Sequence, residues 1–294
     1  MDRKKFLQTL GLVPFIKPAM AMNSLSELAN LPASEKEMPV LFLGHGNPMN
    51  AIEENQFVAG FRNMAKTIPH PKAVLCISAH WETKGTLVTA MERPKTIHDF
   101  GGFPKALFDV QYPAPGSPAF AKELQSSIHG TSIGLNQDWG LDHGCWTVLK
   151  HFFPKADVPV VQMSLDYSQG PKYHYELAKE LAALRKKGVL IVGSGNMVHN
   201  LGMVAWDKMN ADDYAYDWAR EASNKMKSLI HSGDHAGLIN YASQGKAFQM
   251  SIPSPDHFLP LLYILALQGK NEQPVIFNDK AVAGSLTMTS VKFG

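Results

Sequence analysis

An apolar run breaks directly into a turn at Val40-Leu41-Phe42-Leu43-Gly44-His45-Gly46. Similar runs lead to histidines at Ala73-Val74-Leu75-Cys76-Ile77-Ser78-Ala79-His80 and Val189-Leu190-Ile191-Val192-Gly193-Ser194-Gly195-Asn196-Met197-Val198-His199. Short apolar runs of this kind predict buried strands. In an open α/β sheet, ligands and catalytic groups collect beyond the carboxyl ends of the strands. Because neutral histidine is the commonest nitrogen ligand of metals, the pattern predicts a metalloenzyme.

Outward from these runs, the chain alternates between strand-like and helix-like patterns. Strands are expected at 40–43, 73–78, 86–90, 158–164, 189–193 and 285–292. Helices are expected at 51–66, from 118 after a Ser117 cap, and at 146–153, 173–187, 212–230, 236–241 and 258–267. Strands separated by helices predict an α/β single domain with a mostly parallel central sheet flanked by helices on both faces.

The composition is that of an ordinary globular protein. Lys and Arg total 28 against 26 for Asp and Glu in 294 residues, and no basic stripe occurs, so nucleic-acid binding is not indicated. The two cysteines, Cys76 and Cys145, form no Cys-x-x-Cys pair, which predicts two reduced, buried thiols. Beyond the N-terminal segment, no stretch reaches the roughly 18 apolar residues of a membrane span.

The N-terminal segment has a different character. Basic residues at Arg3-Lys4-Lys5 precede an apolar stretch, and Ala19-Met20-Ala21 matches an A-x-A cleavage pattern. Arg3-Lys4-Lys5-Phe6-Leu7 also resembles a twin-arginine export signal with lysine in place of the second arginine. Residues 1–36 are therefore expected to be a leader or a disordered tail, and 37–294 the catalytic domain. A periplasmic and a cytoplasmic location both stay open.

Three more histidine motifs can carry chemistry. His257 follows Ser254-Pro255-Asp256 at an expected helix start, with Asp256 as the N-cap, where the helix dipole disfavours a charged imidazole. His143 precedes an expected helix and can act as an acid or an oxyanion donor, with Asp142 orienting a neighbour. His199 fits either a general base with a pKa near neutrality or a further metal ligand.

The other histidines and the long loop complete the expectations. A loop over 92–117, rich in Pro and Gly, contains His98, Phe100 and Phe103, which we expect to bind substrate. The remaining histidines are expected to be solvated: His70, His129, His151, His174, His231 and His235. G-x-S-x-G, Walker, Rossmann and H-E-x-x-H patterns do not occur in the sequence.

Taken in order, these motifs resemble the class III extradiol ring-cleaving dioxygenases, and within them the branch of the bacterial 4,5-DOPA dioxygenase extradiol proteins. The resemblance runs from about Met38 to Gly294. It rests on the stretches 41–50, 78–81, 96–104, 112–116, 142–144, 195–200 and 255–260.

The resemblance implies that His45, His80 and His257 are ligands of one divalent metal ion. It implies that His199 is the catalytic base or a fourth ligand, and that His143 is an acid or a hydrogen-bond donor. In the wider superfamily the third ligand is usually a glutamate, which gives a 2-His-1-carboxylate site that suits Fe(II). An all-histidine site also binds Zn(II) well, so the expected metal is Fe(II) for activity or Zn(II) as bound.

The implied reaction opens the ring of a DOPA-like catechol with O2. His199 removes a catechol proton, His143 donates a proton as the O–O bond breaks, and a lactone is hydrolysed to a muconic semialdehyde. Two other readings use the same residues: a zinc-dependent hydrolase, and a non-catalytic ligand-binding member of the fold. The presence of His143 and His199 beside the expected ligands favours catalysis. A monomer or a small homo-oligomer is expected.

Overall fold

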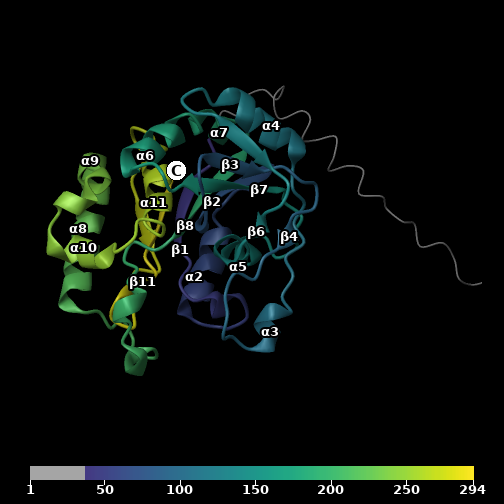
Figure 1. The fold of residues 1–294 in the computed structure, drawn as a ribbon. Coiled ribbons are helices and arrows are strands. Elements are labelled where there is room, and N and C mark those ends of the chain that lie inside the picture. Colours follow the sequence, from purple (N-terminus) through teal and green to yellow (C-terminus); the bar gives the residue numbers. More distant parts are fainter. Residues whose placement is uncertain (1–36) are drawn as a thin grey trace, which may run out of the picture.

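The computed structural model describes residues 37–294, so the expected leader over 1–36 lies outside the described residues. An eight-stranded sheet forms the centre, in the order β5-β3-β7-β2-β8-β1-β12-β9 (Figure 1). The strands are β1 (Val40–Gly44), β2 (Ala73–Thr83), β3 (Thr86–Thr89), β5 (Ile133–Asn136), β7 (Val160–Asp166), β8 (Val189–Gly195), β9 (Val275–Phe277) and β12 (Ser290–Phe293).

The middle of the sheet is parallel. β7, β2, β8 and β1 are successive parallel neighbours, and β3 and β5 also pair in parallel. The pairing is antiparallel between β3 and β7 and along the β1–β12–β9 edge. This arrangement confirms the expected α/β class with a mostly parallel sheet. The end of the chain supplies β9 and β12 of this edge, and the short segment between these two strands suffices because antiparallel neighbours need no crossover helix.

Helices cover both faces of the sheet (Figure 1). One face packs against α2 (Gln56–Ala65) and α5 (His143–Phe152), and the other against α4 (Pro118–Ser127), α6 (Pro171–Lys179) and α11 (Leu259–Ala266). Outside α11 lie α8 (Asp217–Ser232), α9 (His235–Ile239) and α10 (Lys246–Ser251).

Each face of the sheet carries its own apolar core, which explains the uninterrupted apolar runs in the sequence. In β1, Val40 and Phe42 belong to one core, whereas Leu41 and Leu43 belong to the other. All four side chains are fully buried. A central strand between two helical layers has no solvent-facing side, so its sequence does not alternate between apolar and polar residues.

Several elements differ from the expected bounds. The expected helix over 173–187 is two helices, α6 and α7 (Ala182–Lys186), and the expected strand over 285–292 is divided into β11 (Leu286–Thr287) and β12. β11 pairs with β10 (Ala281–Val282) in a separate small sheet. The start of α4 agrees with the prediction, since the Ser117 side chain accepts a hydrogen bond from the backbone N–H of Phe120.

The long loop over 92–117 is partly ordered by its own short elements. It contains β4 (Lys95–Thr96), which pairs with β6 (Gly140–Leu141), and the short helix α3 (Lys105–Phe108). The β4–β6 pair brings the residues after Thr96 close to the start of α5. The loop is therefore attached to the part of the fold from which His143 projects.

Two histidines that the sequence suggested to be solvated are buried. His174 lies on the inner side of α6, where its Nδ1 is 3.0 Å from the Tyr263 hydroxyl. His151, on α5, donates from Nε2 to the carbonyl oxygen of Asn50 at 2.7 Å. The prediction was wrong for both because a polar neighbourhood in the sequence does not reveal which face of a helix meets the core.

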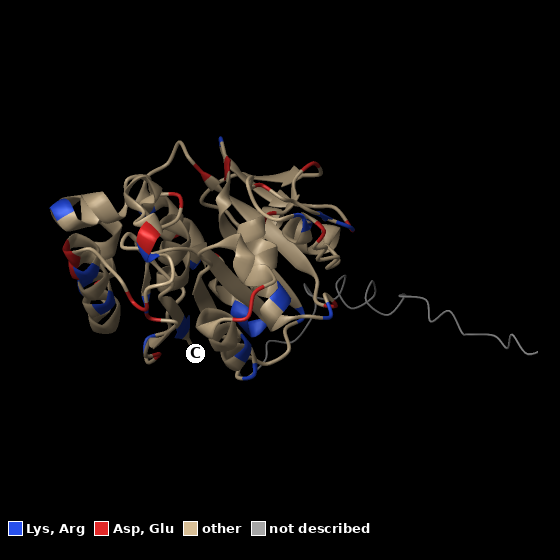
Figure 2. Ribbon diagram, turned by 90° about the horizontal axis from the view of Figure 1, so that it is seen from below, with Lys and Arg blue, Asp and Glu red and all other residues tan. Residues whose placement is uncertain are grey.

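The surface and the cysteines fit the expectations from composition. Acidic and basic residues are interspersed over the periphery of the molecule (Figure 2). Cys76 and Cys145 are free and buried. Among the helices of residues 37–294, none combines the length and hydrophobicity needed to span a membrane.

Candidate active site

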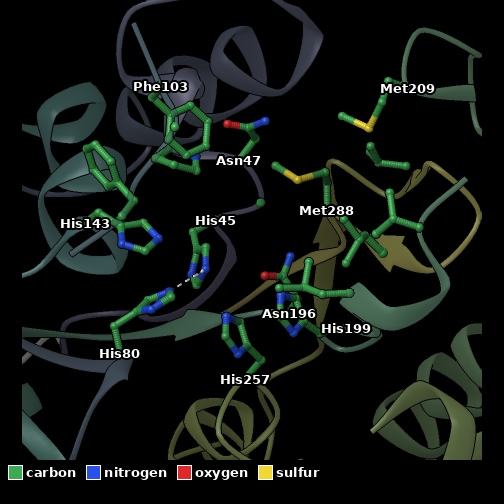
Figure 3. Close-up of a pocket in the computed structure, with 18 of the residues that line it drawn as sticks. His45, Asn47, His80, Phe103, His143, Asn196, His199, Met209, His257 and Met288 are labelled. Carbon is green, nitrogen blue, oxygen red and sulfur yellow. Dashed lines mark hydrogen bonds between the residues drawn. The ribbon is translucent and has the colours of Figure 1, made fainter. Parts of the chain in front are cut away.

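The candidate site lies at the carboxyl ends of the central strands. In the sheet, β8 lies between β2 and β1, with Gly195 opposite Gly44 and Ser194 opposite Ser78. The residues that follow these positions therefore emerge at the same edge, as the rule for ligand sites in open α/β sheets predicts. His45, His80, His143, His199 and His257 all line one cavity there (Figure 3).

His80 reaches the cavity from inside a strand rather than from beyond its end. β2 continues to Thr83, but its pairing with β7 shifts register between Ile77 and Glu82. At this irregularity the backbone N–H of His80 bonds to the Ser78 hydroxyl at 3.2 Å. Such bulges redirect side chains and are common beside active sites.

The segment carrying His257 is held directly against the end of β8. The backbone N–H of Asn196 donates to the carbonyl oxygen of His257 at 2.9 Å. A Cβ atom at Gly195 would lie only 2.1 Å from that same oxygen, so this close approach requires glycine. The first turn of α11 begins after Phe258, so Asp256 is not its N-cap as the sequence suggested. The Asp256 carboxylate instead contacts His257 Nδ1.

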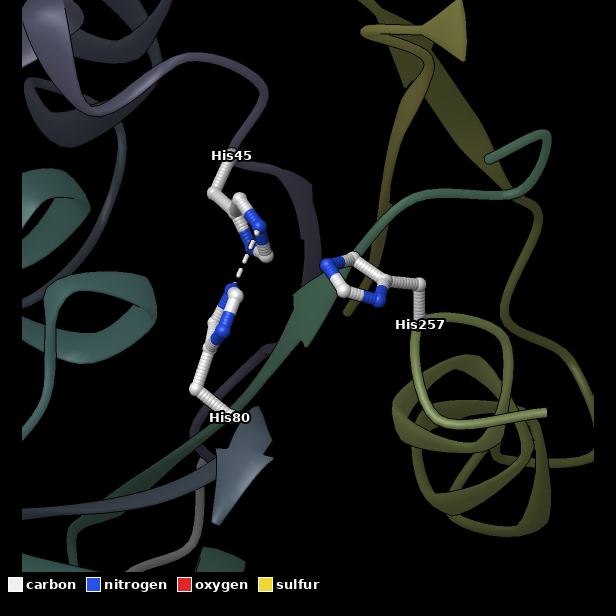
Figure 4. A group of neighbouring side chains, drawn as sticks. All are labelled: His45, His80 and His257. Carbon is white, nitrogen blue, oxygen red and sulfur yellow. Dashed lines mark hydrogen bonds between the residues drawn. The ribbon is translucent and has the colours of Figure 1, made fainter. Parts of the chain in front are cut away.

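His45, His80 and His257 form a compact group, here called the histidine cluster (Figure 4). One ring nitrogen from each lies within 4.8 Å of the others. The Nε2 atoms of His45 and His80 are 3.1 Å apart. Within the described residues, His199 is not part of this group; its ring stacks face to face on His257, with 3.5 Å between ring centroids.

The hydrogen bonds behind the histidine cluster determine which nitrogens face inward. The Ser194 hydroxyl donates to the carbonyl oxygen of Gly144 at 2.5 Å, so it accepts the N–H of His45 Nδ1 at 3.0 Å. The Asp256 carboxylate accepts from His257 Nδ1 in the same way. The Nδ1 of His80 lies 3.6 Å from Asp99. In His45 and His257 the hydrogen bond made by Nδ1 leaves the Nε2 lone pair free to face the centre of the cluster.

The imidazoles of His45 and His80 are held neutral by their surroundings. Burial, reinforced by the neighbouring histidines, places the pKa values of His45 and His80 well below the ordinary range. Burial alone would raise the pKa of Asp256, but its contact with His257 lowers it to about 2. Neutral imidazole is the form that binds a metal ion.

His143 and Asp99 form a second polar group beside the cluster. The Nδ1 of His143 lies 2.9 Å from Asp99, and the backbone N–H of His143 donates to the same carboxylate at 2.8 Å. Burial would raise the pKa of Asp99, but the contacts with His143 lower it. The His143 ring also packs on His80, with 3.8 Å between centroids. Asp99 therefore orients both His143 and His80.

Asp142, which the sequence suggested as an orienting residue, contacts the backbone of α5 and the strand that carries His80. It caps α5 by accepting from the backbone N–H of Cys145, and it accepts from the Ser78 hydroxyl at 2.7 Å. Burial raises the pKa of its carboxyl group, and the bonds from Ser78 and Gln162 oppose that effect. Its bond to Ser78 ties α5 to the strand that carries His80.

His199 is positioned by backbone bonds on two sides. Its N–H donates to the carbonyl oxygen of Ser251 at 2.9 Å, and it forms an isolated β-bridge with Leu286. Burial, followed by the effect of His257, lowers the pKa of His199 to about 3. The expected pKa near neutrality is therefore not found, and His199 is a neutral imidazole in this structure.

The cavity has a volume of about 530 Å³ and is mostly apolar beyond the histidines. Phe100 and Phe103 line it as expected, but His98 does not. The Nε2 of His98 donates to the carbonyl oxygen of Val110 at 2.9 Å, and its ring packs beside Trp146. The neighbouring Asp99 is the polar residue of this loop that reaches the site.

Asn196 is a lining residue whose role the sequence did not suggest. It is 1% exposed, and its Nδ2 donates to the carbonyl oxygen of Thr287 at 2.7 Å. Its Oδ1 has no hydrogen-bond partner among the described residues, and it lies on the side of Asn196 toward His45 (Figure 3). A buried acceptor of this kind is costly unless a ligand or water donates to it.

Asp99, Ser194 and Asn196 all lie in stretches that the sequence had marked, but their roles depend on partners far along the chain. Asp99 acts on His143, and Ser194 links His45 to the start of α5. No local spacing indicates such pairs.

Comparison with known proteins places this arrangement in a family. Residues 39–293 match the family described as the catalytic LigB subunit of aromatic ring-opening dioxygenase. The chain is 44% identical over 265 residues to 4,5-DOPA dioxygenase extradiol of Escherichia coli (strain K12), covering 89% of this chain and 96% of the relative. It is 32% identical over 259 residues to 4,5-DOPA dioxygenase extradiol of Beta vulgaris, covering 86% and 95%.

A solved structure shares the fold. The crystal structure of an uncharacterized protein from Escherichia coli K12 superposes with a TM-score of 0.76 at 39% identity, covering 87% of this chain and all of that one.

Proposed function

This chain belongs to the family of catalytic LigB subunits of aromatic ring-opening dioxygenase, and on that basis we propose that it is a metal-dependent extradiol dioxygenase. The proposed substrate is a catechol, whose ring is opened beside one hydroxyl group with both atoms of O2 entering the product. The product is a muconic semialdehyde. The observation that carries the metal-dependent part is the inward orientation of the histidine cluster.

The cluster fits a metal ion better than it fits an empty polar pocket. The Nε2 atoms of His45 and His80 face each other at 3.1 Å, and both rings are held neutral with Nδ1 directed toward an acceptor or carboxylate. Two nitrogen ligands of one ion, each at about 2.1 Å, lie roughly 3 to 3.4 Å apart. We therefore propose His45, His80 and His257 as the ligands of one divalent ion.

A divalent ion bound there would supply Lewis acidity and, as Fe(II), the electron transfer that the reaction of O2 with a closed-shell ring requires. We propose that Fe(II) is the working metal, and an all-histidine set also accommodates Zn(II). His199 takes the proton of a catechol hydroxyl. It is neutral before the substrate arrives, and the negative charge of a catecholate beside it favours its protonated form.

His143 acts at the opposite side of the cluster. The Asp99 carboxylate lies 2.9 Å from the Nδ1 of His143, and we propose that Nε2 of His143 donates a proton to oxygen as the ring opens. Phe100 and Phe103 pack against the catechol ring and exclude water. The unpartnered Asn196 Oδ1 accepts a hydrogen bond from the bound ligand.

The test is oxygen uptake by full-length protein loaded anaerobically with Fe(II). Catechol, DOPA, caffeate and protocatechuate are supplied in turn, with labelled O2 and mass analysis of the product. We expect one O2 to be consumed per catechol opened, with both labelled atoms in the product, and no uptake by the Zn(II)-loaded control, since zinc has no redox chemistry. Absence of uptake with every catechol would contradict the proposal.

A further inference from the structure

We propose that the cavity accommodates a catechol with an uncharged, apolar substituent, which lies against a group of side chains at the cavity entrance. This group, here called the mouth wall, is Leu201, Val204, Trp206 and Met209. The inference rests on the proposed function, because it specifies which class of catechol that site prefers.

The mouth wall consists of apolar side chains, of which Leu201 and Trp206 are exposed and Val204 and Met209 are half-buried. Trp206 is 73% exposed and Leu201 is 62% exposed, although both line the cavity. They lie in the two short 3-10 helices η3 (Leu201–Met203) and η4 (Trp206–Lys208), which follow directly after His199. A grouped exposed apolar surface at the edge of a cavity is typical of a ligand-binding surface.

The apolar surface continues from the entrance to the histidines. Val282, Leu286 and Met288 also line the cavity, with Met288 on the side of Met209 (Figure 3). Phe103 lies on the side of His143, and the ring centroid of Phe100 is 5.5 Å from that of His143. At about 530 Å³ the cavity is larger than one catechol ring requires. A ring bound at the histidine cluster therefore leaves an apolar space in which its substituent can be buried.

Charged groups are missing from this space. Within residues 37–294, no Lys, Arg, Asp or Glu lines the cavity. The nearest carboxylates in the site, Asp99 and Asp256, are already engaged by histidines. Asp207 and Lys208 lie next to Trp206 in sequence, but they pair with each other at 3.4 Å and do not line the cavity.

A charged substituent would therefore lose hydration in the cavity without gaining an ionic partner. DOPA, which appears in the names of the Escherichia coli and Beta vulgaris relatives, carries both a carboxylate and an ammonium group. 4-Propylcatechol and 3-(3,4-dihydroxyphenyl)propionate provide the sharpest comparison, because they differ only in a terminal methyl group or carboxylate.

The first measurement is kcat/KM of the Fe(II)-loaded, full-length protein for this pair, for catechol and for DOPA. We expect kcat/KM for 4-propylcatechol to exceed that for the propionate and for DOPA by at least about tenfold, because their charged groups lose hydration in the cavity without an ionic partner. Trp206→Ala should lower the ratio of kcat/KM for 4-propylcatechol to that for catechol by roughly tenfold. Tyr167→Ala, which removes an aromatic side chain that is 61% exposed away from the cavity, should leave this ratio unchanged.

The second measurement separates this inference from the proposed function. Calorimetric binding to the Zn(II)-loaded protein compares the same two ligands without turnover. Tighter binding of 4-propylcatechol that weakens in Trp206→Ala would support the inference even if no catechol were oxidised, in which case only the proposed function would fail. Equal or tighter binding of the propionate, or no binding of 4-propylcatechol, would overturn the inference while oxygen uptake with other catechols could still uphold the dioxygenase assignment.

Discussion

The histidine cluster and the mouth wall belong to the same cavity but are built in opposite ways. His45 and His257 are buried, and each is held by a hydrogen bond from its Nδ1 to a residue behind it. In the mouth wall, Leu201 and Trp206 lie on short 3-10 helices, Val204 and Met209 follow the ends of these helices, and Trp206 is largely exposed. The histidine cluster is held by the core of the sheet, whereas the mouth wall lies at the surface.

We expect this difference to separate the residues that carry out the proposed reaction from those that select the substrate. Groups that act on reacting atoms must be held within fractions of an ångström, and strand ends with hydrogen-bonded partners provide such rigidity. A surface that recognises a substituent only has to exclude water from apolar atoms, which tolerates looser positioning. Mutations in the cluster should therefore affect metal content and kcat, and mutations in the mouth wall should affect the choice of substrate.

The largest effect is expected for His45→Ala. Removing one of three proposed ligands should weaken metal binding roughly hundred- to thousandfold and reduce oxygen uptake to background. Metal analysis after dialysis, together with oxygen uptake, measures both, with the exposed His129→Ala as the control. Full metal content in the variant would mean that His45 is not a ligand, and the distinction between the two regions would fail there.

A smaller effect is expected for His199→Ala, which tests a residue between the two regions. If His199 is a proton acceptor, its removal should lower kcat by roughly 10²–10⁴-fold while most of the metal stays bound. The measurements are kcat with saturating catechol and metal content on the same preparation. If metal were lost as completely as in His45→Ala, His199 would be a ligand and would belong to the cluster.

His174, a buried histidine outside the cavity, should make the unfolding free energy depend on pH. Burial lowers its pKa to about 4 from an ordinary 6.5, so the unfolded chain binds the proton more readily. Its contribution to stability is complete above pH 6.5 and decreases by up to about 3 kcal/mol as the pH falls to 4. His174→Gln should remove this part of the pH dependence of the unfolding free energy. The exposed His129→Gln should retain it, and an identical pH profile in both variants would refute the assignment.

The smallest effect is expected for the stability of Trp206→Ala. Because the side chain is 73% exposed, the unfolding free energy should change by less than about 0.5 kcal/mol. Denaturant unfolding of the variant and the unmodified protein measures the difference. A loss of several kcal/mol would show that the mouth wall is part of the folded core, which would contradict the contrast between the two regions.

Much of the fold could be predicted because its central strands leave unambiguous patterns. The runs at 40–43, 73–78 and 189–193 all form neighbouring strands, since strands buried on both faces must be apolar throughout. The short strands β4, β5, β6, β9 and β10 were missed, because elements of two to four residues depend on their partners rather than on a local pattern.

The sequence predicted which histidines line the cavity, but not how their side chains are arranged. His45, His80, His143, His199 and His257 were all identified from the sequence, and all line the cavity. His98 was expected beside them but lies outside the lining. Which side chain of a loop faces inward depends on how that loop is attached to the rest of the fold.

The sequence by itself determined the class of fold, the family and the residue types of the site, because apolar runs and histidines at strand ends are local features. Only the tertiary structure decided that Ser194 and Asp256 turn the Nε2 atoms of His45 and His257 inward, and that Trp206 joins the cavity. Asp256 is the chain neighbour of His257, but Ser194 and His45 lie 149 residues apart, and the three histidines of the cluster meet only when strand register and close backbone approach bring them together.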